Sequence, residues 1–161
     1  MVVGFGTGRC GSVSLSMCLN TMHEWAGLNE GKYLSEMDDR GWAKWFSTLA
    51  SVTHKHGKTY GDISLDHIHN LDYWLGQRDV TLICLMRDRD ETVDSIMNYK
   101  TQRIWERLFP QFDFTDGESV GEFWDWYYET ILEHEDKFII ISPDQLDIVE
   151  NKGEIWQNRR T

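Results

Sequence analysis

Four short apolar runs are spaced along the chain, with helical patterns between them. The runs are Val2–Phe5, Thr59–Ile63, Val80–Met86 and Phe138–Ile141, and each has the length and residue types of a buried strand. Strands that alternate with helices form βαβ units and a mainly parallel sheet. The pattern therefore predicts a three-layer α/β fold with about four strands and helices on both faces of the sheet.

Helical periodicity fills the intervals between these runs. One helix is predicted over Ser12–His23, directly after a glycine-rich loop, another is capped by Asp90, and a later one spans Ser119–Glu133. A further helix is predicted between the helix over Ser12–His23 and the helix capped by Asp90. Its apolar residues recur at i, i+3, i+4 and i+7, a spacing that forms one stripe facing the core. The residues of this stripe are Trp42, Trp45, Phe46 and Leu49.

Composition limits the class of protein. A chain of 161 residues without a Pro/Gly/Ser linker predicts a single domain over residues 1–161. No apolar run is long enough for a membrane span, and no signal peptide is expected. The net charge of -11 opposes nucleic-acid binding over most of the surface. Three cysteines, an odd number, favour a reduced, cytoplasmic setting.

The strongest chemical signal is the glycine-rich segment from Gly4 to Ser12, between the first strand and the first helix. Its glycines allow left-handed backbone and close approach of a ligand, and the free amides at the helix start favour an anion. Arg9 is the only formally charged side chain between Met1 and His23. The segment therefore predicts a phosphate-binding loop with one dedicated cation.

Two common phosphate-loop patterns fit these residues only in part. Gly6 and Gly11 match the spacing of GxxxxGK[ST], but Ser12 stands where the lysine is required, which argues against an ordinary nucleoside triphosphatase. Gly6-x-Gly8-x-x-Gly11 also satisfies the dinucleotide pattern GxGxxG, with Glu24 or Glu30 near the distance of a ribose-binding acid. Arg9 inside the loop argues against that class, because dinucleotide turns normally present bare backbone.

A second basic motif follows the third apolar run. Arg87 stands at the predicted carboxyl end of a strand, where open α/β sheets bind ligands, and Ser95 lies eight residues later, one turn into the next helix. A guanidinium and a hydroxyl so placed can bind the same phosphate. The alternative is that Arg87 and Arg89 pair with the neighbouring acidic residues on a solvated face.

Together, the two motifs resemble those of sulfotransferases. The segment from Thr7 to Leu15 is similar to the loop that binds the 5′-phosphosulfate, and Arg87 with Ser95 is similar to the 3′-phosphate signature. Two departures are Arg89, where proline is common, and Ser14, where some members carry an adenine-stacking tryptophan. The positions that the resemblance assigns to the donor are Gly8, Arg9, Cys10, Gly11, Ser12, Val13, Arg87 and Ser95.

The resemblance implies a P-loop-like core and the transfer of a sulfuryl group without a metal. The donor is 3′-phosphoadenosine 5′-phosphosulfate (PAPS), the product is 3′,5′-diphosphoadenosine (PAP), and the acceptor is a hydroxyl or amine of a small molecule or glycan. Many members are longer, so the acceptor pocket is expected to be abbreviated or completed by a second copy of the chain. The alternatives are an NAD(P)-dependent oxidoreductase, a divergent kinase and a nucleotide-binding module without turnover.

The general base is the least constrained assignment. Asp62 is the first candidate because it ends the second predicted strand, and Glu30 is the second because some sulfotransferases place a glutamate after the first helix. His54 and His56 are further candidates on chemical grounds. The pairs His54-x-His56 and His67-x-His69 have no third ligand at matching spacing, so no metal site is predicted.

Overall fold

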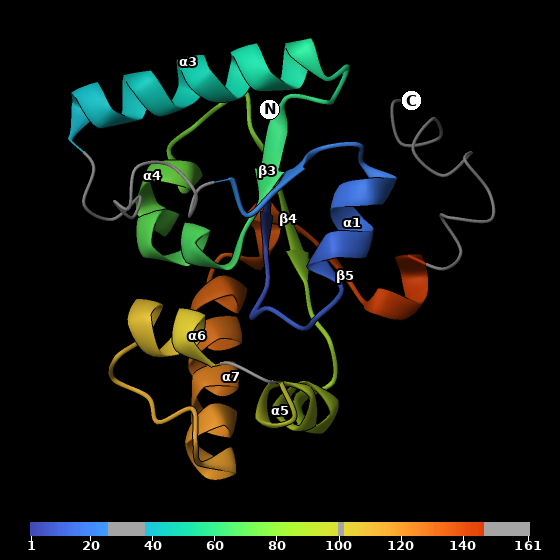
Figure 1. Cartoon of the computed structure of the whole chain (residues 1–161), viewed down its shortest axis with the longest axis vertical. Helices are drawn as coiled ribbons and strands as arrows, with labels where there is room; N and C mark the ends of the chain where they lie inside the picture. The colour runs from blue at the N-terminus through green and yellow to red at the C-terminus, as the bar shows by residue number, and fades with distance from the viewer. Residues whose placement is uncertain (26–37, 100–101, 147–161) are drawn as a thin grey trace.

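The computed structural model describes residues 1–25, 38–99 and 102–146. Its centre is one sheet of five parallel strands in the order β2-β3-β1-β4-β5 (Figure 1). The predicted parallel sheet is confirmed, with one strand more than the four expected. The strands are β1 (Val2–Phe5), β2 (Met22–His23), β3 (Gly61–Ile63), β4 (Thr81–Leu85) and β5 (Phe138–Ile141).

Helices connect these strands and cover the sheet. The α-helices are α1 (Ser12–Cys18), α3 (Asp39–Lys55), α4 (Leu71–Leu75), α5 (Arg89–Met97), α6 (Arg103–Leu108) and α7 (Gly117–Leu132). Two 3₁₀ helices, η2 (Leu65–Asn70) and η3 (Glu135–Lys137), lie directly before α4 and β5.

Side chains alternate strictly between the two faces of the sheet. On β4, Leu82 and Cys84 join a large apolar cluster with residues of α3, α4, α6 and α7, whereas Ile83 and Leu85 join a smaller one with Leu15 of α1. Alternate residues of a strand point to opposite faces. Helices therefore cover both faces, with α1 on one side of the sheet and α4 on the other (Figure 1).

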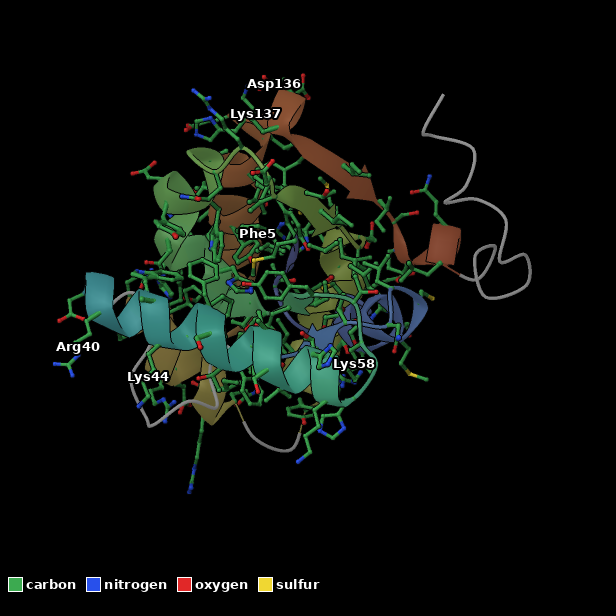
Figure 2. All side chains as sticks on the ribbon, turned by 90° about the horizontal axis from the view of Figure 1, so that it is seen from above. Phe5, Arg40, Lys44, Lys58, Asp136 and Lys137 are labelled. Atoms are coloured by element: carbon green, nitrogen blue, oxygen red, sulfur yellow. The ribbon has the colours of Figure 1, made fainter. Side chains whose placement is uncertain are left out.

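The tryptophan stripe of α3 belongs to the large cluster, as predicted. Trp45 and Leu49 are fully buried, and the ring of Trp42 stacks on Tyr73 with the ring centroids 4.5 Å apart. Figure 2 shows Phe5 in the interior of the molecule, while Arg40 and Lys44 extend outward from α3. These tryptophans form the core rather than a ligand site.

The first predicted helix is wrong at its carboxyl end. It stops at Cys18, and Asn20 takes a left-handed conformation with φ 52° that turns the chain into β2. Asparagine tolerates this conformation better than most residues, and it ends helices for that reason. Met22 and His23, which the predicted helix included, therefore form a short additional strand at the edge of the sheet.

The region after β4 also differs from the prediction. Asp88, not Asp90, caps α5: its carboxylate accepts a hydrogen bond from the Glu91 backbone N–H at 3.1 Å. The helix α6 was not predicted at all. None of the three cysteines forms a disulfide, and none of the described helices combines the length and apolar character that crossing a membrane requires.

Candidate functional site

A cavity of about 730 Å³ opens at the carboxyl edge of the sheet. Four neighbouring strands contribute to it: the loop after β1, His23 and Glu24 at the end of β2, Leu65 after β3, and Arg87 after β4. Its remaining wall comes from the segment around α6, with Tyr99 and Arg103. The volume is in the range of sites that hold a small-molecule ligand or cofactor.

This position follows from the topology. β2 and β3 lie on one side of β1, and β4 and β5 lie on the other. The connections that leave β1 and β4 therefore diverge and open a crevice at the carboxyl ends of these two strands. Open α/β sheets bind their ligands at this kind of switch point.

The glycine-rich loop turns sharply around the cavity. Gly8, Arg9 and Gly11 all have positive φ, at 76°, 55° and 99°. Left-handed backbone is uncommon for a residue other than glycine, and it is concentrated at functional sites. Among the described non-glycine residues only Arg9, Asn20 and Glu24 adopt it, and two of these, Arg9 and Glu24, line the cavity.

Aromatic side chains from α6 and α7 hold the loop in place. The indole N–H of Trp105 donates to the carbonyl of Thr7 at 2.8 Å, and the backbone N–H of Gly6 donates to the hydroxyl of Tyr127 at 3.0 Å. The Tyr127 hydroxyl in turn donates to the carbonyl of Leu65 at 3.2 Å. Burial raises the pKa of Tyr127 far above its usual value, so the phenol stays neutral and keeps both bonds.

The two predicted phosphate motifs meet at this cavity. Nη1 of Arg87 donates to the backbone carbonyl of Arg9 at 3.0 Å, although the residues are 78 positions apart. Nε of Arg9 donates to Oγ of Ser95 at 3.2 Å, and its guanidinium lies 4.8 Å from the centre of the Tyr99 ring. The two arginines thus share one site, and Ser95 joins it through Arg9 rather than by lining the cavity itself.

Other residues of the loop take distinct places. Gly8, Gly11, Ser12 and Val13 line the cavity, and Oγ of Ser12 lies 3.0 Å from Nε2 of His23. The Cys10 side chain is fully buried beneath the loop, which raises the pKa of its thiol to about 11. Cys10 is therefore a packing residue and does not line the main cavity.

Arg87 also borders a second, smaller cavity of about 280 Å³. This cavity lies between the loop at Gly11, the end of β4, and the segment after β5 at Ser142 and Asp144. Nε of Arg87 bonds Glu91 at 3.0 Å, so the side chain is held from both sides. The two bonds engage two of the five N–H donors of a guanidinium, which leaves capacity for an anion.

Asp62 lies apart from the cavity. Its side chain is fully buried, with Oδ1 accepting a hydrogen bond from the Trp25 backbone N–H at 3.0 Å and Oδ2 lying 3.3 Å from Nε2 of His67. The position of Asp62 near the end of a strand was predicted. Its carboxylate lies on the face of the sheet that carries the large apolar cluster, because its partner in β1 is Val3, a residue of that cluster. Asp62 is thus a structural carboxylate and not a cavity-lining base.

Two further positions singled out in the sequence, Ser14 and Arg89, do not line the cavity. Glu30 lies outside the described residues, and Ser14 is half-buried in α1. Arg89, expected to add a cation to the pocket, instead forms a double hydrogen bond to Asp125 of α7, with both N–O distances 2.9 Å. This pairing raises the pKa of Arg89 and fastens α5 to α7.

The histidine pairs do not form a site. His54 and His56 are exposed at the end of α3, whereas His67 is fully buried and the ring of His69 stacks on Phe109. No group of three or more potential ligands for a metal ion occurs within residues 1–25, 38–99 and 102–146.

Several cavity residues were missed by the sequence analysis. Arg103 and Trp105 belong to α6, which was not predicted, and Tyr99 lies just before that helix. His23 was missed because the predicted helix ran through it, and Glu24 was considered only as a ribose-binding acid of the dinucleotide pattern. The available signal was Asn20, since an asparagine after an apolar helix often marks its end.

No protein-family model matches the chain, and no curated protein matches it at a significant level. The resemblance to sulfotransferases therefore stays a prediction from the two sequence motifs.

Replacing Gly8 by alanine is expected to destabilise the loop more than an equivalent change elsewhere. Gly57→Ala is the matched control, since Gly57 has φ 61° and nothing within 4 Å of the added Cβ, so backbone strain alone costs about 1–2 kcal/mol. At Gly8 the Cβ would also lie 2.9 Å from Cζ2 of Trp105, which adds about 1–3 kcal/mol. Denaturant unfolding measures both; equal losses would contradict the contact with Trp105.

Proposed function

We propose that the chain is a sulfotransferase that moves a sulfuryl group from PAPS to a hydroxyl or amine of a small molecule or glycan. The observation that carries this proposal is the convergence of the two motifs. Arg9 and Arg87 belong to loops 78 residues apart, yet one donates a hydrogen bond to the other's backbone, and both line one cavity of about 730 Å³. In this proposal, the sheet and loop act as a P-loop-like nucleotide-binding core.

The charges of the cavity suit an anionic donor. The whole chain carries a net charge of -11, but among the described residues the cavity wall contains Arg9, Arg87 and Arg103 against one carboxylate, that of Glu24. PAPS carries about four negative charges, and guanidinium groups within a few ångströms of such an anion attract it more strongly than distant carboxylates repel it. The local excess of positive charge therefore supports the binding of PAPS, although the net negative charge of the protein would repel it.

The two arginines have different expected roles. Arg9 and Ser12 lie on the glycine loop and are proposed to bind the 5′-phosphosulfate, where negative charge grows on the bridging oxygen as the sulfuryl group leaves. Arg87 is proposed to bind the 3′-phosphate at the end of β4. Ser95 acts through Arg9, whose guanidinium it orients. Ser14 stands where some sulfotransferases carry a tryptophan that stacks on adenine. Tyr99 is proposed to take this role, because its exposed aromatic ring lies in the cavity wall.

The acceptor has its own part of the same cavity. His23, Glu24 and Leu65 line the side that lies toward β2 and β3, away from β4. An acceptor bound there would approach the sulfur from the side opposite the leaving phosphate, as in-line transfer requires. We place this activity in the cytoplasm, a setting that three cysteines without a disulfide favour.

Ligand-induced stabilisation tests the proposal. At a free concentration of about 100 times its Kd, PAP is expected to add about 2.7 kcal/mol of stability, which corresponds to a Tm increase of roughly 5–10 °C. NAD, NADP and ATP form the comparison panel. Stabilisation by NAD or ATP without any effect of PAP would replace this proposal with an oxidoreductase or a kinase.

A matched pair of variants locates the bound ligand. Arg87→Ala removes a cavity-lining guanidinium, whereas Arg89→Ala removes one that pairs with Asp125 on α7. The shift caused by PAP should shrink only in Arg87→Ala. Transfer of the sulfuryl group from PAPS to a library of hydroxyl and amine acceptors then separates an enzyme from a module that binds the nucleotide without turnover.

A further inference from the structure

We propose that His23 is the catalytic base that takes the proton from the acceptor. This inference rests on the proposed sulfuryl transfer and assigns the role that the sequence left open. His23 ends β2, lines the main cavity, and keeps 24% of its side chain exposed. It thus combines access to a ligand with a fixed position in the sheet.

The distances place His23 beside the group to be transferred. Its Nε2 lies 3.0 Å from Oγ of Ser12, the loop hydroxyl proposed to contact the 5′-phosphosulfate. The sulfuryl group is attached to that phosphate, so an acceptor oxygen that attacks the sulfur would arrive next to the same imidazole. A general base must lie within hydrogen-bond reach of the proton that it removes.

The other histidines cannot take this role. All six histidines of the chain lie in the described residues, and His23 is the only one that lines the cavity. His67 is fully buried in the core, and His69 stacks on Phe109. The exposed His54 belongs to α3, outside the cavity wall, which makes it a suitable control.

Asp62 has a supporting role in this arrangement. Its carboxylate accepts the Trp25 backbone N–H, and the backbone N–H of Glu24 donates to the carbonyl of Ile63 at 2.8 Å. These two bonds fix the chain directly after His23 to β3. The buried carboxylate that the sequence suggested as the base is therefore a positioning residue for the histidine.

The pairing of Ser12, His23 and Glu24 differs from that of a hydrolytic triad. In a triad the acid bonds the ring nitrogen that does not face the serine. Here Oε1 of Glu24 lies 4.0 Å from Nε2, the same nitrogen that faces Ser12. The geometry does not support Ser12 as a nucleophile, and it leaves the glutamate to stabilise the positive charge that His23 acquires.

The proposed step transfers the sulfuryl group and moves one proton from the acceptor to the protein. The acceptor oxygen forms a bond to the sulfur of PAPS, and the bond between the sulfur and the bridging oxygen of the 5′-phosphate breaks. The electron pair of that bond stays on the phosphate, which leaves as PAP, while the acceptor proton moves to Nε2 of His23. Ser12 turns its hydroxyl to the phosphate, which frees Nε2 for the acceptor.

The test compares His23→Gln with His54→Gln. Glutamine can donate a hydrogen bond to Ser12 but cannot take a proton, so kcat should fall roughly 100-fold or more, while PAP affinity is retained. The contribution of the imidazole to the pH profile of kcat, a fall toward acid, should disappear in His23→Gln. His54→Gln should keep both the rate and the pH profile. The charged groups that share the cavity with His23 are Glu24, Arg9, Arg87 and Arg103.

Each contrary outcome has a separate meaning. A His23→Gln variant that keeps the wild-type rate and acid limb would overturn the base. Equal losses of PAP affinity and kcat would also overturn it, since His23 would then only position Ser12. His23→Asn repeats the test with a shorter side chain if His23→Gln does not fold. Failure of the wild-type protein to bind PAP would overturn the proposed function itself.

Discussion

Arg9→Ala is expected to lower kcat roughly 100- to 1,000-fold, the usual cost of removing a donor that stabilises charge formed in the transition state. The affinity for PAP, which lacks the sulfuryl group, should change much less. The reason is the position of Arg9 on the loop beside Ser12, where the bridging oxygen gains charge as the sulfur leaves. Pre-steady-state rates with PAPS, together with Kd values for PAP, measure the two effects separately.

Arg87→Ala should lower the affinity for PAP more than it lowers kcat. Loss of a charge-assisted hydrogen bond to the 3′-phosphate is expected to weaken PAP binding roughly 10- to 100-fold. Some loss of kcat should accompany it, because Arg87 also donates to the carbonyl of Arg9 and helps to hold the loop. Arg89→Ala is the matched control. If Arg9→Ala and Arg87→Ala change kcat and Kd in equal proportion, the assignment of the two arginines to opposite ends of the donor is wrong.

Asp62→Ala is expected to destabilise the protein by about 3–5 kcal/mol, the cost of breaking a buried pair of ionisable groups by removing one partner. The change leaves the Trp25 backbone N–H and the fully buried imidazole of His67 without their carboxylate. Unfolding by urea at fixed pH measures the loss. Such a large effect from one side chain would be a substantial fraction of the stability of a domain.

Two controls define the origin of that loss. Asp62→Asn keeps an acceptor oxygen for Trp25 and nearly the same volume, so it should cost clearly less than Asp62→Ala. Asp90→Ala removes a carboxylate that is 92% exposed, and it should change stability by less than about 1 kcal/mol. If all three variants unfold at the same denaturant concentration, Asp62 does not hold the core in the way described.

Much of the fold could be predicted from hydrophobic patterning. The apolar runs at Val2–Phe5 and Phe138–Ile141 became strands with those bounds, and the stripe on α3 became part of the core. These elements bury continuous apolar surface, so their periodicity is visible in the sequence. The two-residue strand β2 and the six-residue helix α6 are too short to establish a period, and both were missed.

The candidate site was likewise predictable only in part. The glycine loop and Arg87 were predicted because glycine spacing and a cation after a strand are local signals. His23, Tyr99 and Arg103 reach the cavity only through the tertiary arrangement of β2 and α6, which no local pattern encodes. The burial of Asp62 also depended on register: its alignment with Val3 of β1 decides the face of the sheet on which it lies.

The position of β2 at the margin of the sheet separates the two halves of the proposed reaction. The donor groups follow β1 and β4, which pair with each other over four residue positions at the centre of the sheet. His23 sits on an edge strand that is joined to β3 at two positions. Peripheral segments of this kind open locally at lower free energy than central strands. Substitutions in β2 could therefore change which acceptor binds, while the donor-binding residues after β1 and β4 stay in place.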